Sequence, residues 1–497
     1  MQQLTWLVDA LRALFAPLTD EIESVIPTDL VGSLPALTLV AFGLLALLVG
    51  LRYNPLSLSL LGVVVASFEM VLFDATGPSF GSLFVRDGLS DFFIYIVLIV
   101  AFLMLVSSSS FDGDTGAYNF LLMMSFAGAI WVVMAADLIA LFVAWELMST
   151  PTYVLVAMSP NRSGIDGATK YFVMGLMSTM LILLGIALLY GVTGTTQMAA
   201  VGRAVSDVWN TVPVGQAAYT ILLAIVLLVV AFGFKIGVFP GWMWVPDTYS
   251  AADGNIAGYL AGATKKTGVA AIIRLLFVAL AVARYEWIWV LALVSVLTMT
   301  IGNYLALGQK SVVRMLAFSS IAMMGYLFMG IAASTEFGVA AASFHALVHA
   351  LMKGGAFILI WAISLKMAKD VTYDDLAGLG KRSPLAAGIL AVLVLSLIGV
   401  PFAAGFWSKI FLLWSAVDAG LWWLAVLGIL NMVMSLGYYV PLLSKMYQEE
   451  PSDSTPLSVA RAPLFVSAVC AVLLVIMMID WGLAMDYAWS AGSALFP

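Results

Sequence analysis

Long apolar runs separated by short polar stretches make up most of this chain. Runs of about 18 or more apolar residues recur from one end to the other, and each can cross a hydrocarbon core about 30 Å thick as a helix. The chain contains about fourteen apolar runs of this length. The pattern predicts an all-α polytopic membrane protein with about fourteen transmembrane helices.

Two of the predicted helices, the seventh and the twelfth, contain a proline among glycines close to a lysine. Pro240 follows Lys235 in FGFKIGVFPGW, and Pro401 precedes Lys409 in SLIGVPFAAGFWSKI. Proline removes a backbone N–H and kinks a helix, so both helices are predicted to be discontinuous. A helix continuing through Pro240 would leave the carbonyl of Ile236 free to hold water or a proton donor.

The two lysine-bearing helices indicate an internal repeat, because GFK at 233–235 and GFWSK at 405–409 occupy successive five-helix units. Successive units with an odd number of helices enter the membrane from opposite sides, which predicts inverted repeats. The predicted organisation is an amphipathic extension (1–30), helices one to three (31–110), the first repeat (111–282), the second repeat (283–448) and a C-terminal helix (449–497).

Composition and charge exclude several classes of protein. The chain is 63% hydrophobic and 10% charged, which no soluble domain matches, and its net charge of −7 argues against a nucleic-acid partner. Cys470 is the single cysteine, so no disulfide or iron–sulfur framework is available. No nucleotide loop or catalytic triad is visible, which argues against a nucleotide-driven pump or a hydrolase.

The distribution of basic residues predicts the orientation. The first stretch is interrupted by Asp9, Arg12 and Pro17 and ends acidic, so it is interpreted as an amphipathic extension and not as a signal peptide. With both termini on the outer face, most Lys and Arg residues outside the apolar runs lie on the inner side. Both ends outside also requires an even number of helices.

Charged residues inside the apolar runs are the candidate functional groups. An ion at mid-membrane costs at least about 2.5–3.5 kcal/mol, so it needs a partner, water or a function. Glu146 in the fifth helix is a candidate counter-ion for Lys235, and breaking and remaking this pair would move charge. The alternative is a carboxyl that is kept neutral by burial or satisfied by Ser149 and Thr150.

The consecutive residues Lys265 and Lys266 point about 100° apart on a helix, so both cannot face one pathway equally. One is expected to face the bundle interior and exchange protons, while the other pairs or extends to the interface. The residues alone leave the choice between them open.

His345, His349 and Lys353 follow one another at intervals of four and form one helical stripe. A proton relay is favoured, because imidazole exchanges protons near neutral pH. The alternatives are a hydrogen-bonded polar seam and a metal site, which lacks a third ligand and would be repelled by Lys353. Lys409 is a further site candidate, with extension to the interface as its alternative.

Four acidic residues are secondary candidates. Glu69 and Asp480 are expected to contact neighbouring subunits or headgroups, and Asp247 and Asp253 are expected to be solvated at the inner surface, lining a proton entrance. Taken together, the buried charges predict an ion-translocating function with no metal or cofactor site in this chain.

Several segments resemble the antiporter-like membrane subunits of respiratory complex I. They include AWELMSTPTYVL at 144–155, GFKIGVFPGWMWVPDTY at 233–249, KKTGVAAIIRLL at 265–276 and the region around GFWSK. MWVPDTY before the lysine helix is most similar to the N-type subunit of NADH-quinone oxidoreductase or of a related archaeal or bacterial dehydrogenase.

The resemblance implies a proton-translocating subunit with fourteen helices and two inverted five-helix repeats, in the plasma membrane of a prokaryote. It implies a Glu146–Lys235 pair, Lys265 as the central exchanging lysine and Lys409 as the lysine of the broken twelfth helix. It also implies no cofactor in this chain: quinone, iron–sulfur and flavin centres would lie in partner subunits, including a peripheral redox arm. M-type and K-type subunits would be the membrane neighbours.

Three departures from the family pattern keep alternatives open. The segment HALVHALMKGGAF is similar to subunits of sodium/proton antiporters and membrane-bound hydrogenases, and Lys266 is an extra lysine whose charge should perturb Lys265. The alternatives are therefore a subunit of a multi-subunit sodium/proton antiporter or membrane-bound hydrogenase, or a non-pumping structural spacer. TYSAADGN also lacks the acidic and proline-containing continuation usual in the family.

Overall fold

The computed structural model describes residues 2–73, 75–111, 113–159, 162–211, 216–451 and 455–496. Ten helices within these ranges are long and apolar enough to cross a membrane, which confirms the prediction of a helical polytopic membrane protein. They are α5 (Gly88–Ser107), α6 (Thr115–Met134), α7 (Leu138–Ala157), α8 (Arg162–Thr193), α10 (Gln216–Ile236), α14 (Arg284–Leu307), α15 (Val312–Ala332), α16 (Glu336–Met367), α20 (Trp422–Gln448) and α21 (Arg461–Ile479).

The remaining helices and one hairpin complete the bundle. Three are apolar helices of 15 to 17 residues: α3 (Leu34–Gly50), α4 (Leu56–Leu72) and α18 (Pro384–Ile398). The others are α1 (Gln2–Val25), α2 (Thr28–Val31), α9 (Met198–Thr211), α11 (Trp244–Ala251), α12 (Gly254–Tyr259), α13 (Lys265–Arg274), α17 (Leu379–Arg382), α19 (Ala404–Asp418), α22 (Gly482–Ser493) and the hairpin of β1 (Gly77–Ser79) and β2 (Phe84–Arg86).

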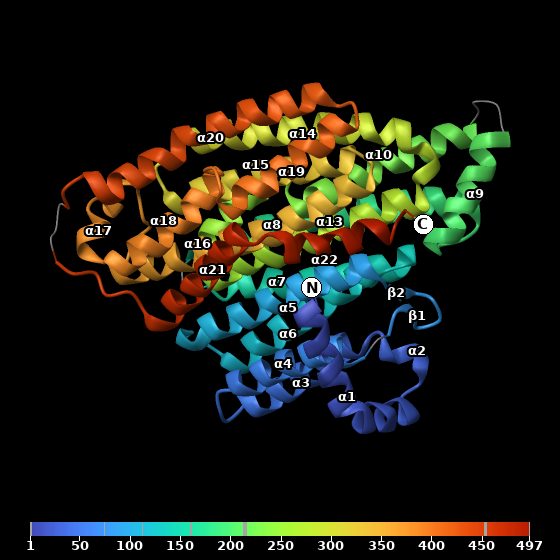
Figure 1. Ribbon diagram of the computed structural model, residues 1–497, viewed down its shortest axis with the longest axis horizontal. Helices are drawn as coiled ribbons and strands as arrows, with labels where there is room; N and C mark the ends of the chain where they lie inside the picture. Colours follow the sequence, from blue (N-terminus) through green and yellow to red (C-terminus); the bar gives the residue numbers. More distant parts are fainter. Residues whose placement is uncertain are drawn as a thin grey trace.

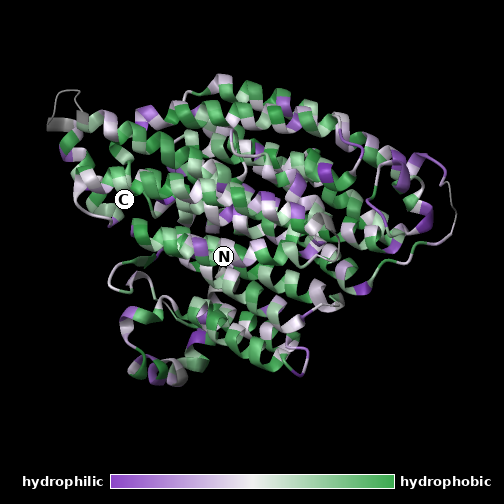
Figure 2. Cartoon of the chain, turned by 180° about the vertical axis from the view of Figure 1, so that it is seen from behind, coloured by the Kyte–Doolittle hydropathy of each residue, from purple (hydrophilic) through white to green (hydrophobic). Residues whose placement is uncertain are grey.

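The spanning helices run alongside one another, and the core lies where they pack. α3 and α4 lie at one edge of the bundle and α14 and α20 at the opposite edge, while α17 marks one end and α9 with the hairpin marks the other (Figure 1). Hydrophobic residues dominate the helices, and hydrophilic residues gather strongly around the end that carries α17 (Figure 2). α15 and α16 are almost wholly buried, so they form the centre of the fold.

The helix breaks differ from the sequence prediction in one respect. α10 already ends at Ile236, where Gly237 has a φ of 79°, and Pro240 lies in the turn beyond. A left-handed backbone at glycine ends a helix, so the break precedes the proline. The second break follows the same rule: α18 ends at Ile398, Gly399 has a φ of 80°, and α19 begins after Pro401.

The helical segment before Lys265 contains a π-helical turn that the sequence did not predict. The π-helical turn at Leu260–Thr264 joins α12 to α13 and ends immediately before Lys265. Such a turn inserts an extra residue and rotates the side chains that follow it, and it occurs frequently at functional sites.

An ion pair joins the end of α13 to the start of α5. Arg274 donates two hydrogen bonds of 2.7 and 2.8 Å to the carboxylate of Asp87, which also caps α5. Burial would raise the pKa of Asp87, but Arg274 and the amide of Ser90 hold this pKa below its usual value. The pair therefore fixes one end of the helix that carries the two consecutive lysines.

We expect Arg274→Met to lower the free energy of unfolding by about 3 kcal/mol at neutral pH, because the Asp87 carboxylate would stay charged without its partner. A carboxyl with a lowered pKa stabilises above its unfolded pKa, so this loss should shrink as the pH falls below about 4. Thermal unfolding of the purified protein followed by circular dichroism measures the change. Arg284→Met, at an exposed position, is the matched control and should leave the transition unchanged.

Candidate functional site

Six basic side chains among the described residues lie completely buried in the interior of the bundle. They are lysines and histidines, and their relative exposure is 0%. We call them the buried row: Lys265, Lys266, His345, His349, Lys353 and Lys409. They come from α13, α16 and α19, so the fold brings together residues separated by more than a hundred positions.

Glu146 and Lys235 meet beside the row. The Lys235 Nζ atom lies 3.0 Å from Glu146 Oε1 and also contacts Ser149 Oγ at 3.3 Å. The Thr179 hydroxyl donates a hydrogen bond of 2.7 Å to the same carboxylate oxygen. Lys235 is 4% exposed and Glu146 is 27% exposed, so the carboxylate forms the more accessible side of the pair.

Lys265 lies against the break that ends α10. Its Nζ atom is 3.4 Å from Ser320 Oγ of α15 and 5.1 Å from the centre of the Tyr249 ring. Gly237 faces the same ammonium: a Cβ atom there would lie 3.4 Å from Nζ and only 2.5 Å from Cγ2 of Val245. The break therefore brings backbone close to the lysine, and Val245 leaves no room for a side chain at position 237.

Lys266 points the other way, toward α16. Its Nζ atom lies 2.7 Å from His349 Nδ1 and also donates to the carbonyl of Ala261, in the π-helical turn. One of the two lysines was expected either to extend to the interface or to pair. Both are buried, and Lys266 is the lysine that pairs. The partner of Lys266 is an imidazole and not a carboxylate.

The two histidine rings extend the row toward α19. The His345 and His349 rings stack at 5.8 Å with an angle of 7°, and His345 Nδ1 lies 2.9 Å from Ser408 Oγ. Ser408 directly precedes Lys409 in the chain. The Nε2 atoms of both rings make no hydrogen bond to the residues that the structure describes. Contacts thus run from Lys266 through both imidazoles to the neighbour of Lys409.

Lys409 is held by the second helix break. It donates hydrogen bonds of 2.8 and 3.0 Å to the carbonyls of Leu397 and Ile398, at the end of α18. These carbonyls have no onward helix to bond, because α18 stops there. The Nζ atom also lies 5.6 Å from the centre of the Tyr326 ring.

Lys353 belongs to the histidine stripe in sequence but turns away from it in space. It donates 2.9 Å to the carbonyl of Leu316, contacts the Ser319 hydroxyl and lies 3.4 Å from the Tyr439 hydroxyl. It therefore binds α15 and α20, whereas the two histidines contact α13 and α19. Helical spacing alone does not separate these environments.

The row is rich in groups that accept protons and poor in negative charge. Its members hydrogen-bond to carbonyls, hydroxyls and imidazole, and the one carboxylate in a direct ion pair nearby is Glu146 among the described residues. Like charges in a dry interior oppose one another. Adding a proton at one position disfavours protonation at its neighbours.

The secondary candidates lie apart from the row. Glu69 of α4 accepts a hydrogen bond of 2.6 Å from Thr38 of α3. Asp247 contacts Lys170 at 2.6 Å and Arg314 at 2.9 Å. Partial burial would raise the pKa of Asp247, but these two cations hold it below its usual value. Asp247 therefore joins three segments as part of an ion-pair cluster and is not a freely solvated group.

Several residues that contact the buried row were not predicted from the sequence, because their residue types are common in apolar helices. They are hydroxyl-bearing side chains directed at the lysines and histidines: Tyr249, Ser319, Ser320, Tyr326, Ser408 and Tyr439. The available signal was the presence of adjacent serines in AFSSIAMM and of a serine beside Lys409. No group of three or more His, Cys, Asp or Glu side chains that could hold a metal ion occurs in the described ranges.

Comparison with known proteins identifies close relatives. Residues 135–435 match the family described as NADH:quinone oxidoreductase/Mrp antiporter, TM. The chain is 36% identical to F(420)H(2) dehydrogenase subunit N of Methanosarcina mazei over 475 residues, covering 90% of this chain and 95% of the relative. It is 36% identical to NADH-quinone oxidoreductase subunit N of Trichlorobacter lovleyi over 421 residues, covering 83% and 85%.

Solved structures share the fold. A chain of respiratory complex I from Thermus thermophilus with bound aureothin superposes with a TM-score of 0.77 at 27% identity, covering 92% of this chain and all of the other. A chain of the Mrp complex from Dietzia sp. DQ12-45-1b gives a TM-score of 0.82 at 22% identity, with 94% and 97% covered. The second likeness concerns the fold alone.

Proposed function

Because this chain belongs to the NADH:quinone oxidoreductase/Mrp antiporter membrane family, we propose that it is the proton-translocating membrane subunit of a complex I-like quinone oxidoreductase. The observation that carries this proposal is the buried row with the Glu146–Lys235 pair beside it. Such groups are costly inside a membrane protein, and proton relays are a principal reason for their presence.

The contacts suggest the order of transfer. Protons pass between the Glu146–Lys235 pair and Lys265, and from the consecutive lysines to the histidines through the contact of Lys266 with His349. His345 and Ser408 then lead to Lys409. Each group can hold a proton and release it, and the like-charge repulsion within the row drives a proton onward when another enters.

The energy for this movement comes from partner subunits. In this proposal the chain carries no cofactor, and quinone reduction in neighbouring subunits, supported by iron–sulfur and flavin centres of a peripheral arm, shifts the charge of the Glu146–Lys235 pair. M-type and K-type subunits flank the chain in the plasma membrane of a prokaryote. The chain has fourteen spans in two inverted five-helix repeats, and both termini lie on the outer face.

A second candidate function is sodium/proton exchange as part of a multi-subunit antiporter, which the histidine stripe and the fold shared with the Mrp complex favour. The two functions differ in what drives transport. Exchange of protons for sodium in vesicles without any electron donor supports the antiporter, whereas proton uptake that requires quinone reduction supports the dehydrogenase.

Lys409→Ala tests the proposal in the purified complex reconstituted into vesicles. We expect fewer protons to be taken up per electron, because the row loses its terminal proton acceptor. A pH-sensitive dye reports proton uptake while quinone reduction is followed by absorbance. Lys381→Ala removes a largely exposed lysine and should change neither quantity. An unchanged ratio for Lys409→Ala would contradict the proposed route.

A further inference from the structure

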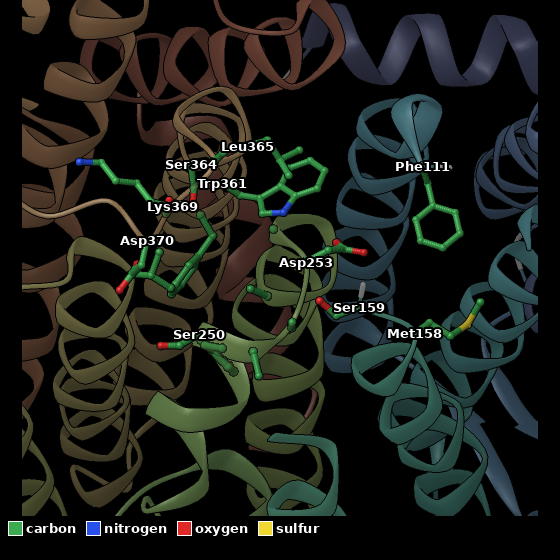
Figure 3. A pocket seen from close by; sticks show the side chains of 18 of the residues that line it. Phe111, Met158, Ser159, Ser250, Asp253, Trp361, Ser364, Leu365, Lys369 and Asp370 are labelled. Atoms are coloured by element: carbon green, nitrogen blue, oxygen red, sulfur yellow. Dashed lines mark hydrogen bonds between the residues drawn. The ribbon is translucent and has the colours of Figure 1, made fainter. Parts of the chain in front are cut away.

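A cavity of about 720 Å³ opens at the end of the bundle that carries α17. It lies between the end of α7, the connection from α11 to α12, and the end of α16 (Figure 3). Its walls include Ser159, Trp361, Lys369 and Asp370, and Asp253 lies between Trp361 and Ser159 in this view. The cavity is large enough for many water molecules.

Asp253 is a carboxylate buried in the wall of this cavity, with an exposed fraction of 5%. It lies in the connection between α11 and α12, where Oδ1 accepts the amides of Asn255 and Ile256 at 2.8 and 3.0 Å. Burial raises the pKa of Asp253 to about 6, while those amides and the Tyr118 hydroxyl oppose this rise. A carboxyl with this pKa exchanges protons near neutral pH.

The cavity reaches the neighbourhood of Lys265. Tyr249 lines the cavity, and its ring lies 5.1 Å from the Nζ atom of that lysine. The Tyr249 hydroxyl and both polar atoms of the Asn255 side chain are buried without a hydrogen-bond partner among the described residues. Buried polar atoms are almost always satisfied, so these atoms point to bound water.

We propose that this cavity is the water-filled port through which protons reach Lys265, with Asp253 as the group that first takes the proton. This inference rests on the proposed function and adds the place of uptake. A hydronium ion gives its proton to the Asp253 carboxylate and becomes water. The carboxyl then gives the proton to the water chain beside Tyr249, which delivers it to the neutral amine of Lys265.

The charges around the cavity suit this role. Lys369 at the mouth is paired with Asp375 at 2.6 Å, and Asp370 accepts a hydrogen bond from Ser311. The titratable groups that line the cavity or contact Asp253 are Tyr118, Tyr249, Lys369 and Asp370. None is a buried cation in contact with Asp253, so the carboxyl remains free to take a proton.

Asp253→Asn tests the port in the reconstituted complex. Asparagine caps a helix as well as aspartate does, so α12 should keep its start, while the side chain can no longer take a proton. We expect proton uptake to slow by about 100-fold at neutral pH, the lower end of what a positioned proton-transfer group contributes. The pH dependence near pH 6 should also disappear.

Asp114→Asn is the matched control, because Asp114 caps α6 at an exposed position and lies outside the cavity lining. Unchanged uptake and an unchanged pH profile for Asp253→Asn would overturn the port. If Lys265→Ala blocks proton uptake while Asp253→Asn does not, the port fails and the proposed function stands. If Lys265→Ala leaves uptake intact, the proposed function fails.

Access to the cavity can be measured without any pumping assay. Ala257 lines the cavity and is 1% exposed, so Ala257→Cys should react with a charged, water-soluble methanethiosulfonate only if water reaches it. We expect labelling from the α17 end and none from the other. Ser343→Cys, buried away from the cavity, and the native Cys470 should stay unlabelled. Absence of labelling at position 257 would overturn a water-filled port.

Discussion

Lys265→Ala is expected to stop proton translocation through this subunit, slowing the transfer step by about 100- to 10,000-fold, as removal of a positioned proton-transfer group does. Lys265 lies between the break of α10, the ring of Tyr249 and Ser320, so no other side chain can replace it there. Proton uptake by vesicles during quinone reduction measures the effect. The fold should persist, because no carboxylate loses its partner.

Lys265→Arg separates a relay from a structural cation. Arginine keeps the positive charge but does not release its proton in a protein. A relay therefore predicts that Lys265→Arg also fails to translocate protons, whereas a purely structural role for the charge predicts that arginine restores the wild-type rate. Lys310→Ala, at an exposed position, provides the matched control.

The second large effect is expected at Lys266. A charged ammonium donates only, so its contact of 2.7 Å with His349 Nδ1 requires a neutral ring that carries its proton on Nε2. A doubly protonated pair would set two cations face to face without a carboxylate. In the proposed route, a proton passes from Nζ of Lys266 to Nδ1 of His349 across this contact.

We expect Lys266→Ala to slow proton uptake by about 100-fold, because the contact between α13 and α16 is lost while Lys265 remains. Lys266→Arg should fail as well, since the proton could no longer leave the side chain. The rate of proton uptake across pH 6 to 9 provides the readout. Lys366→Ala, at the exposed end of α16, is the control, and equal rates for the Lys266 variants and the wild type would place Lys266 outside the route.

The sequence predicted the helical membrane fold well because apolar runs of sufficient length have few other stable states. The helix breaks were predicted less closely. The prolines predicted breaks at 240 and 401, yet the helices end at Ile236 and Ile398, each directly before a glycine whose positive φ changes the chain direction. The π-helical turn before Lys265 was not predictable, because it depends on how α12 packs against α16.

The buried residues of the site were found from composition, since any lysine or histidine within an apolar run is a candidate. Their connections were not found. The interval of four grouped Lys353 with the histidines, but Lys353 contacts α15 and α20. From the sequence, Lys266 was a secondary candidate. In the structure it contacts a histidine of the buried row, because the tertiary structure places His349 beside it.

The environment of Asp253 could not be predicted from the sequence either. In sequence it lies in a polar connection and is predicted, like Asp247, to be solvated at the inner surface beside a proton entrance; its exposed fraction of 5% shows that the predicted solvation was wrong. Burial by α6 and α16 makes it a carboxyl with a raised pKa inside a cavity. Asp247, six positions earlier, has the more conspicuous motif but is neutralised by Lys170 and Arg314.

The central claim is that charge movement within the Glu146–Lys235 pair drives protons along the buried row. The double variant Glu146→Gln/Lys235→Met removes both charges together, and replacing a whole ion pair leaves no unpaired charge to unfold the protein. The most direct measurement is the number of protons taken up per electron by vesicles containing this variant. We expect a lower ratio than for the wild type, with quinone reduction retained; an identical ratio would contradict a role of the pair in driving protons.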